Sequence, residues 1–137
     1  MESLTNSQML PVMPHYPASY QRGVQRIALP YLNRTVMLSV DDITCLQGEG
    51  NYTFLFTRDR KKYLISKTLK EFERTLDGEV FLRVHKSYIV NLGYARRGMF
   101  GADRAIRMAD GREVAVSRRR MKDIFERLSQ YHQDLLN

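Results

Sequence analysis

The sequence contains a single cysteine, Cys45, among its 137 residues. One thiol cannot form an internal disulfide or a cysteine zinc cluster, so neither kind of cross-link stabilises this chain. Cys45 lies in the apolar run ITCL, which predicts a buried and unreactive thiol. The three histidines share no common spacing, which argues against a histidine metal site. The sequence therefore predicts neither a metal nor another cofactor.

Long apolar runs are also missing. No stretch approaches the roughly 20 residues that are needed to span a bilayer. The N-terminus lacks the basic start and the continuous apolar stretch of a signal peptide. These absences predict a cytoplasmic protein without membrane contact. The alternation of strands and helices expected of a Rossmann or receiver-like domain is absent as well. We therefore expect no aspartyl-phosphate switch, so regulation would come from a separate sensor partner or from expression control.

Acidic residues are scarce in the second half of the chain. The whole sequence has 22 basic and 15 acidic residues, a net charge of +7. Residues 1–80 hold 10 basic and 9 acidic groups, whereas residues 81–137 hold 12 and 6. A one-sided basic excess is typical of proteins that bind nucleic acids. Charge alone leaves open an ordinary basic surface.

The chain divides at about residue 22. The first 22 residues contain three of the four prolines and show no regular hydrophobic period. We interpret residues 1–22 as a flexible N-terminal tail and residues 23–137 as the folded domain. Deleting residues 1–20 should then leave thermal stability nearly unchanged. Alternatively, the apolar residues at positions 9–13 pack on a partner subunit.

From residue 25 onward the pattern is mainly β. Short strand-like segments are separated by turn signals at residues 48–51, 59–60, 86–87, 101–103 and 110–111. Helical spacing occurs twice, at residues 66–76 and after Ser117. Ser66 or Thr68 is expected to cap the first helix and Ser117 the second. A buried stripe is expected along the second helix at Met121, Ile124, Phe125 and Leu128. We predict about ten short strands and two helices, with a single helical turn at residues 40–43.

Several motifs occur in a fixed order along this domain. The turn G-x-G-N-Y spans residues 48–52, and the amphipathic SKTLKEFE segment follows at residues 66–73. The series R-x-H-x-S-x-x-V-N spans residues 83–91, and V-S-R-R spans residues 116–119. Together these motifs resemble the LytTR family of DNA-binding domains, which in bacteria usually follow response-regulator receivers. The resemblance covers residues 25–131. It implies an elongated, mainly β fold of small antiparallel sheets.

The resemblance also implies which residues contact DNA. Family members contact DNA through loops and strand ends rather than a recognition helix, and typically occupy repeated sites on one face of the duplex. The corresponding positions here are Asn51, Tyr52, Lys86, Arg118 and Arg119. An arginine can contact guanine through two hydrogen bonds in the major groove, and Lys86 suits a base acceptor or a phosphate. The third arginine, at position 120, departs from the common family pattern, and three successive helical positions cannot all face one groove.

Other polar residues have simpler explanations. Arg83 and His85 share one strand face, so we expect structural hydrogen bonds for them. His85 and Ser87 could suggest nucleophilic catalysis, but no orienting carboxylate is near them in the sequence. Four arginines at positions 96, 97, 104 and 107 are expected on a solvated hairpin, where some would contact the DNA backbone. Arg96 in particular is expected in the middle of a strand.

The sequence therefore predicts a stand-alone bacterial transcription regulator, not an enzyme. It would bind double-stranded DNA with sequence specificity and read the major groove from loops and strand ends. A homodimer on DNA and a separate sensor partner remain open. The alternative function is a LytTR-fold interaction module that pairs with another regulator instead of binding DNA.

Overall fold

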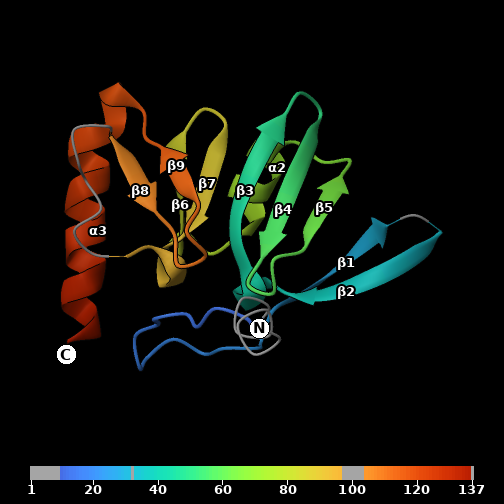
Figure 1. Ribbon diagram of the computed structural model, residues 1–137, viewed down its shortest axis with the longest axis horizontal. Coiled ribbons are helices and arrows are strands. Elements are labelled where there is room, and N and C mark those ends of the chain that lie inside the picture. Colours follow the sequence, from blue (N-terminus) through green and yellow to red (C-terminus); the bar gives the residue numbers. More distant parts are fainter. Residues whose placement is uncertain (1–9, 32, 97–103, 137) are drawn as a thin grey trace, which may run out of the picture.

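The structure is a computed structural model that describes residues 10–31, 33–96 and 104–136 (Figure 1). The strands are short, and the two α-helices of the described residues lie on different sides of the molecule. The strands are β1 (Arg26–Tyr31), β2 (Arg34–Ser39), β3 (Ile43–Glu49), β4 (Tyr52–Thr57), β5 (Lys62–Ile65), β6 (Phe81–His85), β7 (Tyr88–Asn91), β8 (Ala105–Arg107) and β9 (Glu113–Ala115). The helices are α2 (Leu69–Thr75) and α3 (Met121–Leu135), with single 3-10 turns η1 (Val40–Asp42), η2 (Leu92–Tyr94) and η3 (Arg118–Arg120).

Three antiparallel sheets form the body of the molecule. The central sheet has the strand order β5-β4-β3-β7-β6, and β1-β2 and β8-β9 are separate two-stranded ribbons. The expected mainly β architecture is therefore confirmed, with nine strands in the described residues against about ten expected. The hairpin expected around residues 101–103 lies outside the described residues. A bridge between Ala95 and Met108 pairs the chain on either side of it.

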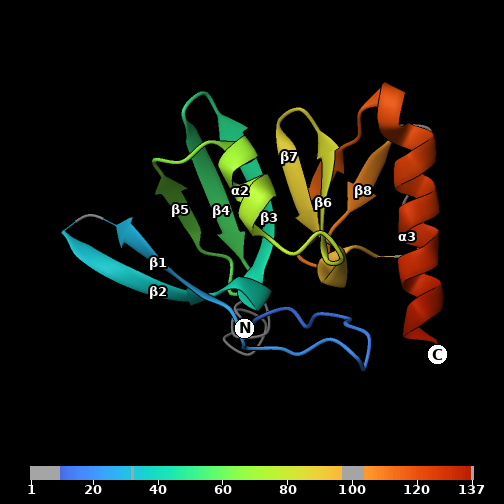
Figure 2. The same cartoon turned by 180° about the vertical axis from the view of Figure 1, so that it is seen from behind.

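The central sheet is covered on both faces. Successive side chains of a strand point to opposite faces, so neighbours such as Cys45 and Leu46 enter different cores. Cys45 packs in a cluster with residues of β8, β9 and α3, whereas Leu46 packs with residues of α2, β1 and β5. Figure 2 shows α2 lying across one face of the sheet, with α3 at its far end. The molecule is thus a sheet enclosed between two small hydrophobic cores.

The first helix begins as the sequence predicted. Thr68 Oγ1 accepts a hydrogen bond from the Glu71 amide at 3.2 Å, and the Thr68 amide donates to Glu71 Oε2 at 2.7 Å. This reciprocal capping box satisfies two amide groups that the first turn leaves without partners. The expected turn at residues 40–43 is also present, as η1.

The last helix differs from the prediction in two ways. Ser117 makes no side-chain capping hydrogen bond, and the chain passes through η3 before α3 begins. The buried stripe is also shifted. Phe125 is 50% exposed, whereas Tyr131, one turn beyond the predicted stripe, is 3% exposed and packs with Ile124 and Leu128. Leu135, the last residue of α3, is partly buried against the same cluster. The buried stripe therefore runs along the whole helix.

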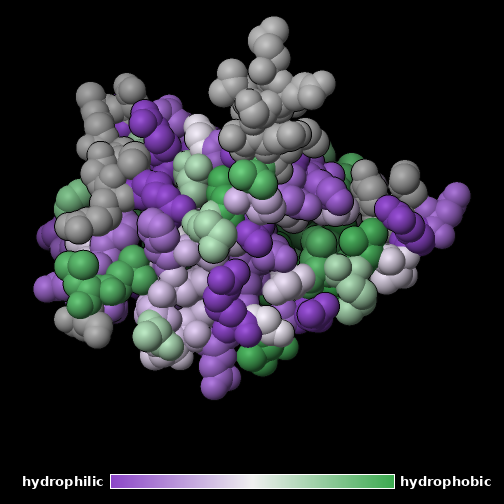
Figure 3. Space-filling view, turned by 60° about the horizontal axis from the view of Figure 1, so that its bottom comes forward, coloured by the Kyte–Doolittle hydropathy of each residue, from purple (hydrophilic) through white to green (hydrophobic). Residues whose placement is uncertain are grey.

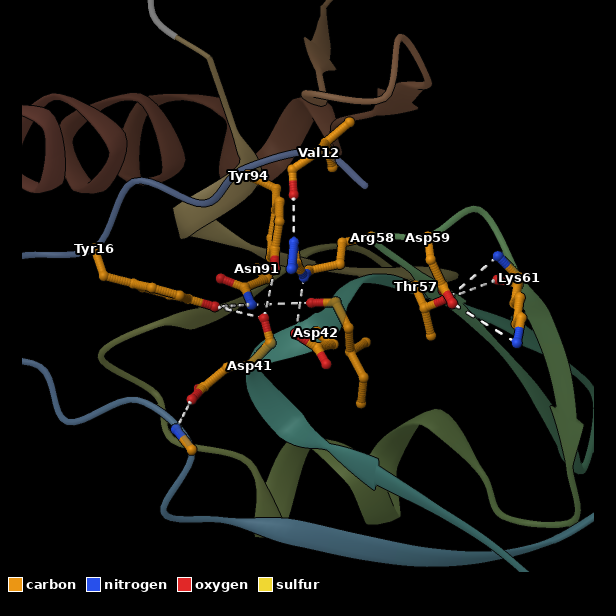
Figure 4. A network of polar contacts seen from close by, with 12 residues as sticks. Val12, Tyr16, Asp41, Asp42, Thr57, Arg58, Asp59, Lys61, Asn91 and Tyr94 are labelled. Atoms are coloured by element: carbon orange, nitrogen blue, oxygen red, sulfur yellow. Dashed lines mark hydrogen bonds and ion pairs between the residues drawn. The ribbon is translucent and has the colours of Figure 1, made fainter. Parts of the chain in front are cut away.

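The described part of the N-terminal segment, residues 10–22, runs along the base of the domain (Figure 1). Its main anchor is Tyr16, whose hydroxyl donates to the Asp41 carbonyl at 3.0 Å and accepts from Asn91 Nδ2 at 2.7 Å. Figure 4 shows this network, which also includes Tyr94, whose hydroxyl donates to the same carbonyl at 2.6 Å. The Asp41 carboxylate accepts from the Tyr20 hydroxyl and from a backbone amide. The sequence led us to expect a flexible tail up to residue 22, and it did not indicate these contacts.

Three arginines of the domain bind backbone carbonyls of this segment. Arg58 donates to the Val12 carbonyl at 3.1 Å and pairs with Asp42, also at 3.1 Å (Figure 4). Arg60 donates to the carbonyl of residue 10, and Arg96 to that of residue 13, both at 2.6 Å. The segment therefore supplies backbone acceptors to guanidinium groups on three different parts of the domain.

Seen from its base, the molecule is mostly hydrophilic, and apolar residues form small separate patches (Figure 3). Among the described residues, no helix is long and apolar enough to cross a membrane.

Candidate nucleic-acid interface

Three loops lie along one edge of the molecule, at the top of Figures 1 and 2. They are the β3–β4 turn, the β6–β7 turn and η3 at the start of the last helix. These loops carry the five residues that the sequence predicted to contact DNA. The fold therefore brings together positions that are separated by up to 68 residues in the chain.

The β3–β4 turn has only two residues between its strands, because Glu49 pairs with Tyr52. Gly50 has a φ of +61°, a conformation that glycine adopts without the steric cost of a side chain. Such a tight turn fixes the register of both strands and projects its tip outward. Asn51 is exposed and the Tyr52 side chain is 48% exposed. Both candidate residues are therefore accessible at the tip.

The β6–β7 turn presents Lys86 in the same direction. Its backbone is held by Arg83, which donates to the His85 carbonyl at 2.8 Å and to the Lys86 carbonyl. The Arg83 guanidinium also pairs with Glu73 at 2.9 Å. His85 Nδ1 accepts a hydrogen bond from the Ser87 amide at 3.1 Å. The expected structural roles of Arg83 and His85 are confirmed, and Lys86 itself is exposed at the turn.

The third loop is η3. Arg118, Arg119 and Arg120 are all exposed. Arg120 lines a pocket between α2 and β6 together with Glu73 and Arg83. This position agrees with the expectation that three successive arginines cannot all face one groove. Arg118 and Arg119 are the better candidates for a shared surface with the other loops.

Two backbone hydrogen bonds fix these loops relative to one another. The Gly48 amide donates to the Ser87 carbonyl at 2.8 Å, which joins the base of the first loop to the second. The Ser117 amide donates to the Val84 carbonyl at 2.8 Å, which joins the start of η3 to β6. Each bond has one end in a strand of the central sheet, at Gly48 of β3 or Val84 of β6, so the three loops form one preorganised edge.

Three cations on this edge have no side-chain partner in the part of the chain that the structure describes. Within residues 10–31, 33–96 and 104–136, no ion pair or side-chain hydrogen bond is formed by Lys86, Arg118 or Arg119. Other arginines are engaged in the fold. Arg127, for instance, donates to two backbone carbonyls, at 2.7 and 3.3 Å. The edge therefore concentrates positive charge that is available to a ligand.

The predicted position of Arg96 is wrong. Arg96 does not lie in the middle of a strand but directly follows the bridge residue Ala95. Its guanidinium donates to the Gly93 carbonyl at 3.2 Å as well as to residue 13. The sequence could not distinguish a solvated arginine from one that anchors a distant segment. The neighbouring Arg97, also considered as a backbone contact, lies outside the described residues.

One cation near the edge was missed by the sequence analysis. Lys67 follows β5, and its carbonyl accepts a hydrogen bond from Thr53 Oγ1 at 2.6 Å. Thr53 immediately follows Tyr52, so Lys67 lies beside the base of the β3–β4 turn. Its side chain is exposed. The antiparallel pairing of β4 with β5 places Lys67 there. The spacing of these two strands in the sequence could have indicated that Lys67 lies next to the β3–β4 turn.

The described residues offer little for metal binding or catalysis. They contain no group of three or more histidine, cysteine or acidic residues that could hold a metal ion. Burial raises the pKa of the Cys45 thiol to about 12, so the thiolate is scarce near neutral pH. This agrees with the buried, unreactive thiol that the sequence predicted. The chemistry available at the loop edge is hydrogen bonding and charge.

Comparison with known proteins agrees with this geometry. Residues 33–129 match the LytTR family, described as the LytTr DNA-binding domain. The fold matches a LytTr DNA-binding domain from Bacillus cereus with a TM-score of 0.65 and 21% sequence identity. That match covers 78% of this chain and 98% of the other.

Curated relatives include longer bacterial proteins. The chain is 38% identical over 111 residues to the heme-containing CO-sensing transcriptional regulator RcoM 1 of Paraburkholderia xenovorans, covering 78% of this chain and 41% of that protein. It is 30% identical over 104 residues to the sensory transduction protein LytT of Bacillus subtilis, covering 74% of this chain and 43% of that protein. The chain thus spans less than half the length of these relatives. The family match extends over most of the chain, and the protein belongs to the LytTR family of DNA-binding domains.

Proposed function

We propose that this protein is a transcription regulator that binds double-stranded DNA with sequence specificity through its loop edge. The observation that carries the proposal is the alignment of three loops on one edge, where Lys86, Arg118 and Arg119 have no side-chain partner among the described residues. Family membership favours this binding function over catalysis. Contact with chromosomal DNA would place the protein in the cytoplasm.

The residues on the edge match the chemistry of the major groove. Arginine reads the O6 and N7 acceptors of guanine, and asparagine can pair with N6 and N7 of adenine. Arg118, Arg119 and Asn51 would supply these base contacts. Lys86 has three donors on one ammonium group and suits either a base acceptor or a phosphate. Tyr52 adds a phenolic hydroxyl at the strand end.

A rigid edge also suits recognition energetically. Each side chain ordered on binding costs about 0.5–1.5 kcal/mol, and a mobile loop would add to that cost. Here the backbone hydrogen bonds from Gly48 and Ser117 hold the loops in place before DNA arrives. Only the side-chain tips would have to become ordered. The cationic edge would also attract DNA from a distance, because electrostatic steering raises association rates.

The first experiment measures DNA binding against salt concentration. Electrostatic binding should weaken with a log–log slope of about −0.9 for each phosphate that the protein neutralises. A selection from random duplex DNA would then supply a preferred site. No binding at low salt would refute the proposal and favour the alternative, a domain that pairs with another regulator.

Substitutions on the selected site test the individual residues. Arg119→Ala should cost roughly 1–3 kcal/mol on the selected DNA and less on scrambled DNA, if it contacts a base. Lys86→Ala should also weaken binding. Arg74→Ala is the matched control, because it removes one exposed charge from the last turn of α2, away from the edge. Equal losses for Arg119→Ala on both DNAs would make Arg119 a phosphate contact and move base reading to Arg118, Asn51 or Tyr52.

The assembly on DNA is part of the same proposal. Repeated sites on one face of the duplex would allow two copies to bind side by side, and a homodimer on DNA is the simplest such arrangement. A separate sensor partner would supply regulation. Footprinting on the selected DNA would show whether one or two sites are protected.

A further inference from the structure

A basic pocket lies away from the loop edge. It has a volume of about 450 Å³ and is lined by residues of the β4–β5 turn and the β8–β9 turn. β4 runs from the edge at Tyr52 to the pocket at Thr57, and β9 runs from the pocket side at Glu113 toward η3. At about 3.3 Å per residue, the length of β4 separates the two places by well over 10 Å. The pocket is therefore a distinct surface.

Positive charge dominates the pocket lining. Among the described residues that line it, the cations are Arg60, Lys61, Lys62 and Arg112, and the only carboxylate is Asp110. Asp110 accepts a hydrogen bond from the Arg112 amide at 3.0 Å, and its carboxylate also lies 4.0 Å from Arg112 Nε, which leaves the Nη donors of Arg112 for a ligand. Lys61 lies 3.8 Å from an aspartate of the same turn, but that pair is exposed and contributes little. Like charges gathered in this way repel one another unless an anion binds between them.

Aromatic rings hold two of these cations in place. The Arg112 guanidinium carbon lies 3.7 Å from the centroid of the Phe56 ring. Lys62 Nζ lies 4.2 Å from the Phe54 centroid and 5.7 Å from that of Phe56. Such cation–π contacts hold the charged groups in place, and a guanidinium stacked on a ring keeps its in-plane hydrogen-bond donors free of the ring. A stacked guanidinium can therefore still bind a phosphate through two hydrogen bonds.

The backbone at Arg60 is unusual in the same place. Arg60 has a φ of +64°, in the left-handed region that favours glycine and asparagine. A side chain there costs roughly 1–2 kcal/mol. The Arg60 guanidinium donates one hydrogen bond, to the carbonyl of residue 10. Arg60 is also one of the residues that line the pocket.

We propose that this pocket binds a small phosphorylated molecule through its phosphate groups. Phe56 is only 6% exposed, so recognition rests on charge and guanidinium hydrogen bonds rather than on stacking against a ring. Several cations suit a ligand with two or more linked phosphates. The site does not depend on the proposed DNA contacts. DNA phosphates offer the same chemistry, and the experiment separates the two sources.

The probe is inorganic pyrophosphate, titrated into the full chain at physiological salt with calorimetry and amide NMR. Saturable binding should appear, with shifts concentrated at residues 56–62 and 110–112. Arg112→Gln and Lys62→Gln should each lower the affinity at least about tenfold, or about 1.4 kcal/mol. Arg74→Gln is the control and should bind pyrophosphate like the parent protein. Melting temperatures establish that each variant is folded.

The second part of the experiment measures the binding of duplex DNA by the same variants. The pocket variants should bind DNA with nearly the parent affinity, whereas Lys86→Gln should bind pyrophosphate normally. Three results would overturn the proposal. The first is the absence of saturable pyrophosphate binding up to about 10 mM. The second is a loss of pyrophosphate affinity in the Arg74→Gln control equal to that in the pocket variants. The third is a loss of DNA affinity in the pocket variants comparable to their loss of pyrophosphate affinity. The last result would make the pocket a contact for the DNA backbone.

Discussion

The contact between Gly93 and Tyr16 allows a sharp test of how the N-terminal segment is attached. A Cβ atom at position 93 would lie 2.5 Å from Cε1 of the Tyr16 ring and 2.9 Å from Cζ. The ring cannot move away freely, because its hydroxyl is bonded to Asn91 and to the Asp41 carbonyl. Overpacking of this kind typically costs 1–3 kcal/mol. Gly93→Ala should therefore lower the melting temperature by roughly 3–12 °C.

A double-mutant cycle identifies the cause. Tyr16→Ala alone removes a partly buried ring and should cost about 2–4 kcal/mol. In that background the space next to Gly93 is empty, so Gly93→Ala should cost less than about 0.5 kcal/mol. The two changes would then show a coupling energy of about 1 kcal/mol or more, which is expected only for residues in contact. Chemical denaturation at constant pH measures all four proteins.

Gly78→Ala is the matched control, because a Cβ atom there would meet nothing within 4 Å. Its stability should stay within about 0.5 kcal/mol of the parent. If Gly93→Ala has the same cost with and without the Tyr16 ring, the segment does not pack against Gly93 and the reasoning is refuted. A neutral Gly93→Ala in the parent protein would refute it as well.

Three further predictions concern the same structure. Deleting residues 1–20 should destabilise the domain at least as much as Tyr16→Ala, and an unchanged melting temperature would support the flexible tail inferred from sequence. Thr68→Ala should cost about 1 kcal/mol because it breaks a capping box, whereas Ser117→Ala should stay within about 0.5 kcal/mol because Ser117 forms no cap; similar losses at both positions would contradict this. Burial, and to a smaller extent nearby positive groups, lower the pKa of His15 below its usual value of 6.5. The unfolded chain therefore binds the proton more readily, so the contribution of His15 to stability is complete above about pH 6.5 and declines as the pH falls through this value. Denaturation curves of the parent and His15→Gln should converge toward acid, and parallel pH profiles would count against the effect.

Local signals in the sequence were sufficient for much of the fold. The glycine at position 50 and the Lys86-Ser87 pair marked two tight turns, and Thr68 was one of two caps expected for the first helix. Each of these features depends on residues within a few positions of one another. Since turn and cap energies are local, a single sequence reveals them. The turn signals also predicted that Asn51, Tyr52 and Lys86, three candidate DNA contacts, lie at or next to turns. The structure places them there.

Long-range contacts were not visible in the sequence. Tyr16 lies among prolines without a hydrophobic period, and its partner Asn91 is 75 residues away. Nothing near Tyr16 in the chain indicates that its ring packs against Gly93. The cap expected at Ser117 failed for a related reason. The backbone amide of Ser117 bonds to Val84 of β6, so tertiary pairing determines the conformation before the last helix.

The distribution of charge shows why net charge by sequence segment is a weak guide to function. The basic excess of residues 81–137 includes Arg83, Arg96 and Arg127, whose guanidinium groups bind carbonyls or carboxylates within the fold. Those charges are not available to DNA in the way that Lys86 or Arg119 would be. Conversely, residues 1–80 are nearly neutral in sum, yet they supply all three cations that meet Arg112 in the basic pocket. The charge that a ligand meets depends on which cations the fold groups together and on how many of their donors internal partners leave available.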